Sequence, residues 1–177
     1  MITIKTILVP VDFSESSYKA ILYGLSFAKQ YQAKAILLSV IDDRVFEESL
    51  LLADFMSLKY NESGARGARK EMVRKKIEPM IIEMRRKFVG VKVEEDIRFG
   101  VVYKEIIKCA QEEEVDMIVM GSHGSSGIKH SLIGGIAEKV IRKAPCPVLT
   151  VKNIEREFVD KSIDYYIRSL LRKQKIS

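Results

Sequence analysis

Residues 116–152 read DMIVMGSHGSSGIKHSLIGGIAEKVIRKAPCPVLTVK, and this stretch decides the fold. It begins with a short apolar run over 116–120, which is typical of a strand buried on both faces of a sheet. Glycines and serines follow, and an amphipathic segment over 136–143 predicts a helix that ends before Pro145. The residues PVLTVK at 147–152 predict another strand. This succession indicates a parallel β-α-β unit.

The same alternation of strands and helices runs through the rest of the chain. Apolar, β-branched runs predict strands over 4–11, 33–41 and 91–98. Amphipathic spacing predicts helices after Ser14, which is placed to cap the first of them, over 72–88, and after Gly100. The chain is therefore expected to form an α/β fold, a three-layer open sandwich with a parallel sheet between helices.

Residues 43–70 interrupt this pattern. They contain an apolar patch, FEESLLLADFMSL, for which a short helix is one interpretation. The stretch NESGARGAR follows, and its glycine, alanine and arginine content predicts a mobile loop. Within it, Arg66 and Arg69 have two interpretations: a lid over a ligand, or a disordered loop, of which we favour the second.

The chain after residue 152 predicts a C-terminal helical extension over 153–177, attached to a single domain over 1–152. Apolar side chains recur along an otherwise charged helix. That stripe needs a partner surface, which the sequence leaves open between its own domain and a second subunit. The stripe consists of Phe158, Val159, Ile163, Tyr166, Ile167, Leu170 and Leu171.

The composition excludes several classes of protein. The 177 residues are 47% hydrophobic and 31% charged, which is ordinary for a globular domain and excludes a disordered or fibrous chain. No apolar run reaches the roughly 18–20 residues of a membrane span, and the N-terminus opens with strand-like alternation, so we expect a cytoplasmic protein. Cys109 and Cys146 lie far apart and are expected to be buried thiols. No metal site is expected.

The net charge of +6 raises the question of a nucleic-acid partner. Lys and Arg are interspersed with Glu and Asp over most of the chain, as on solvated helix faces. Local excesses occur at 64–76 and 85–87, but they lack interleaved aromatic residues or a recognisable module. We therefore expect no nucleic-acid partner.

Two segments predict a ligand crevice. In open α/β sheets, ligands bind outside the carboxyl ends of the strands where the strand order reverses. The residues VPVD at 9–12 and MGSHG at 120–124 both follow buried strands. If those strands are neighbours, Asp12 and Gly121 face one another across the crevice.

The glycines beside this crevice are suited to binding phosphate. A backbone without Cβ approaches phosphate oxygens closely, and the first N–H groups of a helix attract negative charge. Gly134, Gly135 and Ile136 lie where the predicted helix begins. Together these features describe a cradle for a polyphosphate, although the Walker and dinucleotide fingerprints are absent.

The spacing Gly121-x2-Gly124-x9-Gly134 resembles the nucleotide-binding motif of the universal stress protein family, which has an adenine nucleotide α-hydrolase-like fold. The resemblance extends over ILVPVDFSESSYKAILYGLSFAKQYQAKAILLSVID and over 116–152, while 43–90 and the tail carry little of it. It implies a five-stranded parallel sheet of order 3-2-1-4-5. It also implies ATP or a related adenine nucleotide, with Mg²⁺ as an accompanying ion, between strands one and four.

The resemblance carries over residue by residue. It implies that Pro10, Val11 and Asp12 lie beside adenine and ribose, and that the backbone of Val40 meets the adenine edge. The phosphate loop would consist of Met120, Gly121, His123, Gly124, Gly134 and Gly135, with the N–H of Ile136 behind it.

Gly135 departs from the family pattern, in which Ser or Thr follows the last glycine. A hydroxyl that would contact phosphate is missing, and its loss is expected to weaken binding by about 1.5–3 kcal/mol. The backbone N–H persists. We therefore expect weaker binding rather than none.

Several of these residues have a plainer interpretation. Asp12 either caps a turn or contacts the ribose, and we favour the contact. His123 is expected to position the loop rather than to take part in phosphate chemistry, because no metal-ligand partner or paired carboxylate lies near it in sequence. Ser125, Ser126, Lys129 and His130 either meet phosphates or belong to a solvated loop.

The expected function is that of a regulatory nucleotide-binding protein in stress response. No nucleophile–base pair or acidic Mg²⁺ cluster stands out near the loop, so any ATP hydrolysis would be slow. The alternatives are an enzyme acting at the α-phosphate, and a dimerisation module that has lost its nucleotide. A homodimer through the edge of strand five and the C-terminal helix is expected by resemblance to the family.

Overall fold

The computed structural model describes residues 2–42, 62–123 and 135–152. The predicted C-terminal helix and Gly124 to Gly134 lie outside the described residues. The elements alternate along the chain as expected. They are β1 (Thr6–Pro10), α1 (Glu15–Tyr31), β2 (Lys34–Asp42), α3 (Glu62–Lys87), β3 (Val93–Gly100), α4 (Val102–Glu112), β4 (Met117–Gly121), α5 (Gly135–Lys143) and β5 (Val148–Val151).

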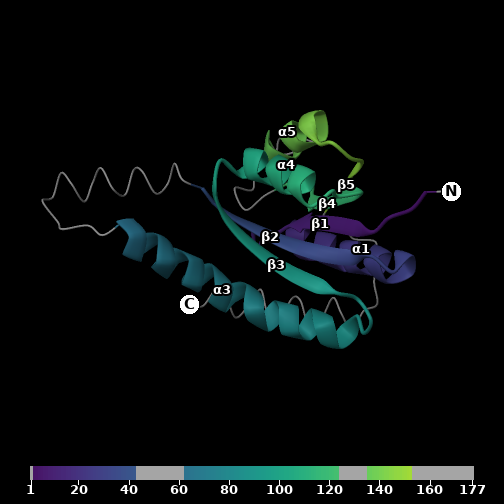
Figure 1. Ribbon diagram of the computed structural model, residues 1–177, viewed down its shortest axis with the longest axis horizontal. Helices are drawn as coiled ribbons and strands as arrows, with labels where there is room; N and C mark the ends of the chain where they lie inside the picture. The colour runs from purple at the N-terminus through teal and green to yellow at the C-terminus, as the bar shows by residue number, and fades with distance from the viewer. Residues whose placement is uncertain (1, 43–61, 124–134, 153–177) are drawn as a thin grey trace, which may run out of the picture.

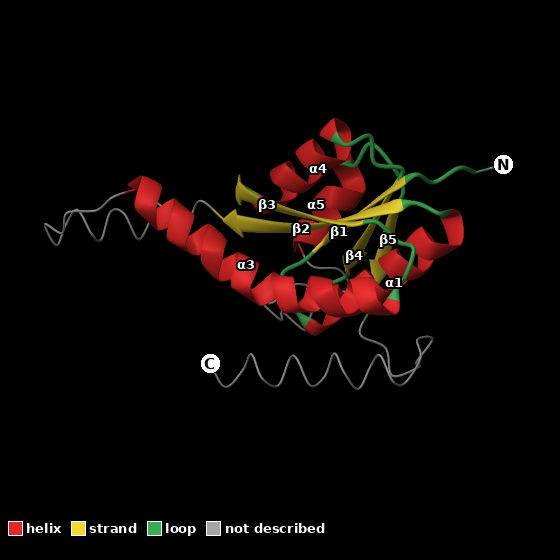
Figure 2. Ribbon diagram, turned by 60° about the horizontal axis from the view of Figure 1, so that its bottom comes forward, coloured by secondary structure: helices red, strands yellow, loops and turns green. Residues whose placement is uncertain are grey.

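The five strands form one sheet in the order β3-β2-β1-β4-β5, and every neighbouring pair is parallel. This confirms the predicted fold class and strand order. Helices α1 and α3 cover one face of the sheet and α4 and α5 cover the other (Figures 1 and 2). The order reverses between β1 and β4, which places the middle of the sheet at the predicted crevice.

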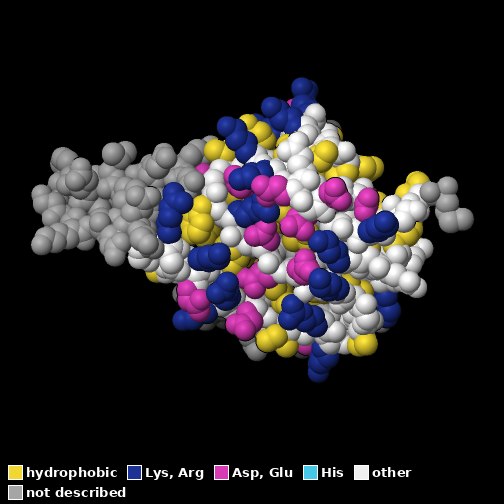
Figure 3. Space-filling model, viewed as in Figure 1, with side chains coloured by type: hydrophobic (Ala, Val, Ile, Leu, Met, Phe, Trp, Pro, Cys, Tyr) yellow, Lys and Arg dark blue, Asp and Glu magenta, His cyan; other side chains and the backbone are white. Residues whose placement is uncertain are grey.

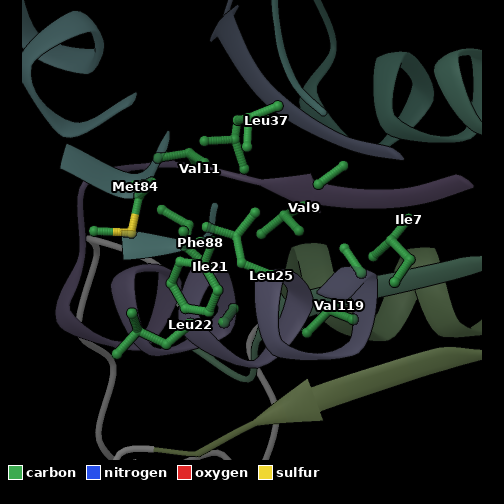
Figure 4. Close-up of a cluster of buried hydrophobic side chains, with 14 of the residues drawn as sticks. Ile7, Val9, Val11, Ile21, Leu22, Leu25, Leu37, Met84, Phe88 and Val119 are labelled. Carbon is green, nitrogen blue, oxygen red and sulfur yellow. The ribbon is translucent and has the colours of Figure 1, made fainter. Parts of the chain in front are cut away.

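Alternate residues of the central strands enter two separate cores. Ile7, Val9 and Leu37 face α1 and α3, where they pack against Leu25 and Met84 (Figure 4). Because successive side chains of a strand point to opposite faces, Leu8, Ile36 and Leu38 enter the second core with α4 and α5. The central strands are apolar on both faces for this reason.

Helix α1 lies unusually close to the sheet at Gly24. A Cβ built on Gly24 would lie 2.5 Å from Val9 Cγ2 and 3.8 Å from Val119 Cβ. Because Gly24 has no side chain, α1 can pack directly against β1 and β4. The position of α1 therefore depends on this glycine.

The loop predicted over 62–70 is wrong, because α3 begins at Glu62 and continues into the predicted helix, ending at Lys87. Ala and Arg are strong helix formers, and their continuity with an amphipathic segment outweighs the cost of two glycines. Arg66 therefore lies on a helix rather than in a disordered loop, and its guanidinium is 5.3 Å from the centre of the Phe99 ring. Arg69 lies on the same helix.

The two cysteines differ. Cys109 is a fully buried residue of α4, and burial raises the pKa of its thiol to about 12. Cys146 was expected to be buried, but it is only half-buried in the turn before β5. Among the described residues, the structure contains no group of three acidic, His or Cys side chains suited to a metal ion.

The charged residues form a mixed surface. Lys and Arg alternate with Asp and Glu over the face shown in Figure 3. Arg98, for example, is 2.6 Å from Asp96 and 2.7 Å from Glu112. Over the described part of the chain, none of the helices is both long enough and apolar enough to cross a bilayer.

We predict that Gly24→Ala destabilises the protein by about 1–2 kcal/mol, because the buried, β-branched Val9 cannot move away from the new methyl group. Gly67→Ala is the matched control, since a Cβ there meets nothing within 4 Å. That change should instead stabilise α3 by about 0.5–1 kcal/mol. Urea unfolding of both variants measures the difference, and equal effects would contradict the close approach.

Candidate functional site

The predicted crevice lies where β1 and β4 part. The two strands are paired at Ile7–Met117 and Leu8–Ile118, and both continue beyond these pairs, to Pro10 and Gly121. After β1 the chain enters α1 on one face of the sheet, and after β4 it leads to α5 on the other face. The two connections diverge, which is the geometry of a ligand crevice in an open α/β sheet.

The turn after β1 is organised by Asp12. Its Oδ1 accepts a hydrogen bond from Ser14 N at 3.0 Å and another from Ser14 Oγ at 2.6 Å. Ser14 in turn caps α1, where its Oγ accepts from Ser17 N at 3.2 Å. Phe13 between them has φ +61, a left-handed conformation that is costly for a bulky residue. Asp12 therefore has the turn-forming role that was the less favoured alternative, and its ribose contact stays a prediction.

The backbone N–H and C=O groups of Val40 point toward the β1 side of β2, where the crevice is predicted. Val11 N donates to Leu38 O at 2.8 Å, so Leu38 directs its backbone polar groups toward β1. Two residues further along the strand, Val40 directs its N–H and C=O the same way. Strand β1 ends at Pro10, which pairs with Leu38, whereas β2 continues to Asp42. Val40 therefore lies in the part of β2 that extends beyond the end of β1. This is the backbone position that the family resemblance implies beside adenine.

The residues that follow β4 are hydrogen-bonded to two other elements. Ser122 is fully buried, and its N–H donates to Val151 O at 2.9 Å. Its hydroxyl is hydrogen-bonded to His123 Nδ1 at 2.9 Å. On the opposite side of the crevice, Ser16 Oγ in the first turn of α1 donates to His123 O. The start of the glycine-rich stretch is thus tied to both β5 and α1.

At Gly121 the packing of α1 against β4 leaves no room for a side chain. A Cβ there would lie 2.6 Å from Ser16 Oγ and 3.0 Å from the Ser16 carbonyl carbon. A strand residue with a side chain would therefore push α1 away. The glycine serves this close approach, whatever its role toward phosphate.

The other end of the glycine-rich stretch enters α5. Because β4 and β5 are parallel, α5 runs back between them and begins at the carboxyl edge of the sheet. Its first residue, Gly135, is exposed, and a Cβ there would meet nothing within 4 Å. Ile136 is 42% exposed. Helices α1 and α5 thus both direct their N-termini to this edge, where their dipoles favour an anion.

The structure brings together Pro10, Val11, Asp12, Val40, Met120, Gly121 and His123 at one edge of the sheet. Gly124, Gly134, Ser125, Ser126, Lys129 and His130 lie outside the described residues. Sequence reasoning missed Ser16 and Ser122, which hold the loop entry. The run SESS after Asp12 was a usable signal, because serines in such turns bond to nearby backbone.

The fold defines the class: an open α/β protein with an all-parallel sheet whose strand order reverses between β1 and β4. A family model described as the universal stress protein family matches residues 3–152, and the chain belongs to that family.

Two curated relatives illustrate the similarity. Universal stress protein MJ0577 of Methanocaldococcus jannaschii is 37% identical over 155 residues, covering 84% of this chain and 94% of that protein. Putative universal stress protein SH1215 of Staphylococcus haemolyticus is 30% identical, covering 88% of each.

Two solved structures are similar in fold and sequence. The structure of hypothetical protein MJ0577 is 33% identical with a TM-score of 0.67, covering 88% of this chain and all of that one. The structure of hypothetical protein PH0823 is 30% identical with a TM-score of 0.63, covering 86% and 99%.

We predict that Gly121→Ala lowers the free energy of unfolding by about 1–3 kcal/mol, because the methyl group collides with Ser16 in a packed contact. Gly135→Ala should leave stability within about 0.5 kcal/mol or raise it, because its methyl group meets open space in the first turn of a helix. Thermal unfolding of the two variants checks the pair. Full stability of Gly121→Ala would mean that α1 does not approach β4 this closely.

Proposed function

We propose that this universal stress protein binds ATP, or a related adenine nucleotide, in the crevice between β1 and β4 as a regulatory ligand. The observation that carries the proposal is the hydrogen bond from Ser16 Oγ to His123 O, which joins the Asp12 turn to the start of the glycine-rich stretch. The two parts of the predicted nucleotide site therefore lie next to each other. The N-termini of α1 and α5 add a favourable field for phosphate.

Asp12 is proposed to contact the ribose while it keeps its structural role. An ionised carboxylate can accept several hydrogen bonds at once, and those from Ser14 N and Ser14 Oγ are two of the interactions that Asp12 makes. Capping and ligand binding are therefore compatible in one residue. The backbone edge of Val40 is proposed to meet adenine, with Pro10 and Val11 beside it.

The phosphates are proposed to lie against backbone N–H groups of the glycine-rich stretch and of Gly135 and Ile136, with Mg²⁺ on the phosphate oxygens. Two structures support an adenine nucleotide in this fold. One is a universal stress protein in complex with cAMP and another is a universal stress protein from Archaeoglobus fulgidus in complex with dAMP. At 21% and 18% identity they establish likeness of fold alone, so the choice of ligand here rests on the residues above.

Gly135 is proposed to reduce affinity rather than to abolish it. Its surroundings have room for a side chain, and its φ is not among the left-handed ones of the described residues. No local constraint explains the glycine. A hydroxyl restored at this position is therefore sterically acceptable and would supply the missing phosphate contact.

We predict that Gly135→Ser tightens ATP binding by about tenfold to a hundredfold, because a charge-assisted hydrogen bond contributes about 1.5–3 kcal/mol. Gly135→Ala is the matched control and should bind like the wild type. Gly124→Asp should lose binding through charge repulsion. Calorimetric titration of ATP with Mg²⁺ into each variant measures the affinities, and mass spectrometry of denatured, freshly purified protein identifies any retained nucleotide.

Two outcomes would contradict the proposal. Absence of binding at millimolar ATP in both the wild type and Gly135→Ser would favour a dimerisation module without a nucleotide. Turnover of ATP at rates typical of enzymes would instead replace the regulatory role with a catalytic one.

We also propose a homodimer through the edge of β5. Pro147 O accepts from Ile118 N and Val151 O accepts from Ser122 N, so alternate residues from 147 to 151 bond to β4. Thr150 is one residue out of step with these, so its N–H points away from β4, at the open edge of the sheet. Such an edge is suited to pairing with a second copy.

We predict that Thr150→Pro converts the dimer to a monomer, because proline removes the outward N–H without breaking the ladder to β4. Thr150→Val is the control that keeps the N–H and should remain dimeric. Sedimentation of both variants at micromolar concentration gives the masses. A monomeric wild type would refute the dimer.

A further inference from the structure

We propose that helix α3 docks on the surface of an anionic lipid membrane through its outer face, without crossing the bilayer. This surface is separate from the proposed nucleotide site and does not depend on it. Three features of the structure support it: the apolar side chains exposed on α3, the net charge of the helix, and the position of its acidic residues.

Helix α3 lies along the outside of the sheet and has two different faces (Figures 1 and 2). Ile77, Met80, Ile81 and Met84 are buried in the core between the helix and the sheet. At 3.6 residues per turn, six exposed residues fall within an arc of about 120° on the opposite side. This outer face consists of Met72, Lys75, Lys76, Pro79, Ile82 and Arg86.

Large apolar side chains are exposed along this side of α3. Met72 is 61% exposed and Ile82 is 60% exposed, and Val89, just beyond the end of the helix, is 74% exposed. Single exposed apolar side chains are common on protein surfaces. Here, however, three of them follow one side of one helix, with cations between them. A helix that only covers a sheet keeps its outer side polar, so this pattern indicates a contact surface.

Helix α3 also carries most of the net charge of the chain. Its nine Lys and Arg residues against four Glu residues give a net charge of +5, compared with +6 for the whole chain. Lys75 and Lys76 are exposed, and among the described residues no acidic side chain forms an ion pair with them. Their charge is therefore available to an anionic partner.

The acidic residues of α3 do not offset the cations of the outer face. Glu83 is the one acidic residue within the arc, and it is only 8% exposed. Its Oε1 lies 3.1 Å from Arg86 Nη2 and 3.5 Å from Lys87 Nζ. Glu71 lies at the flank, with its Oε2 3.8 Å from Arg74 Nη1. The outer face therefore presents positive charge and apolar side chains together.

This combination favours a lipid surface over other anionic partners. Nucleic acid would gain nothing from Met72 and Ile82, and no aromatic residue lies on the outer face to stack on bases. A second copy of α3 would bring two helices of charge +5 together. At an anionic membrane, by contrast, headgroups attract Lys75 and Lys76 while the apolar side chains enter the boundary of the acyl chains.

The experiment is sedimentation of the full chain with vesicles of phosphatidylglycerol and phosphatidylcholine in equal parts, and with vesicles of phosphatidylcholine alone. We expect binding to the anionic vesicles only, weakening as salt is raised. Lys75→Glu combined with Lys76→Glu should weaken it by at least about tenfold, because each cation at such a surface contributes about fivefold. Ile82→Ser should weaken it by about threefold or more.

The matched control is Lys104→Glu combined with Lys108→Glu. Both residues are exposed on α4, which covers the other face of the sheet, and the change in net charge is the same. This variant should bind anionic vesicles within about twofold of the wild type, because it leaves α3 intact. Circular dichroism checks that both double variants fold.

The outcomes separate the lipid surface from its alternatives. Loss of vesicle binding in the α3 double variant, but not in the α4 control, supports the proposal, and weaker binding of Ile82→Ser supports the contact with acyl chains. Equal loss in both double variants, or no vesicle binding by the wild type, overturns it. Binding to duplex DNA instead of vesicles would assign the face to nucleic acid. A sedimentation mass that falls in Ile82→Ser without vesicles would assign it to a second copy.

Discussion

The close approach of α1 to the two central strands is the constraint on which the rest of the structure depends. It is made possible by one glycine on each side of the contact. Gly24 in the helix lets it lie against Val9, and Gly121 in β4 makes room for the backbone of Ser16. Because protein interiors are close-packed, a methyl group at either place would move the helix rather than be absorbed. The helix N-terminus, and with it the edge of the crevice, is set by this packing.

The residues that shape the crevice serve local structure as well. Asp12 holds the turn, Ser14 caps α1, and Phe13 between them keeps a costly left-handed backbone. A strained residue persists where its surroundings over-determine it, and such residues gather at functional sites. Here the turn keeps the Asp12 carboxylate at the mouth of the crevice. The same hydrogen bonds that lead into the cap of α1 fix the position of this carboxylate.

Much of the fold was predictable, because its strands and most helices carry strong local patterns. The five apolar runs of the sheet and the amphipathic segments of α4 and α5 were found near their observed bounds. The error at 62–70 arose because glycines were given more weight than the alanine and arginine residues around them, although the following helix continues through that stretch. The exposure of Cys146 is not predictable in this way, because burial in a turn depends on neighbours that periodicity does not reveal.

The sequence by itself determined the alternation of strands and helices and placed Asp12 and Gly121 after neighbouring strands, because periodicity is a local property of a chain. The candidates Val40 and His123 came from the resemblance to the family. Tertiary structure alone decided that Ser16 holds His123 from 107 residues away, and that Gly121 is required by the backbone of α1. Such contacts depend on how two elements pack across the reversal of the strand order. No local pattern records the distance between segments that meet only in the folded sheet.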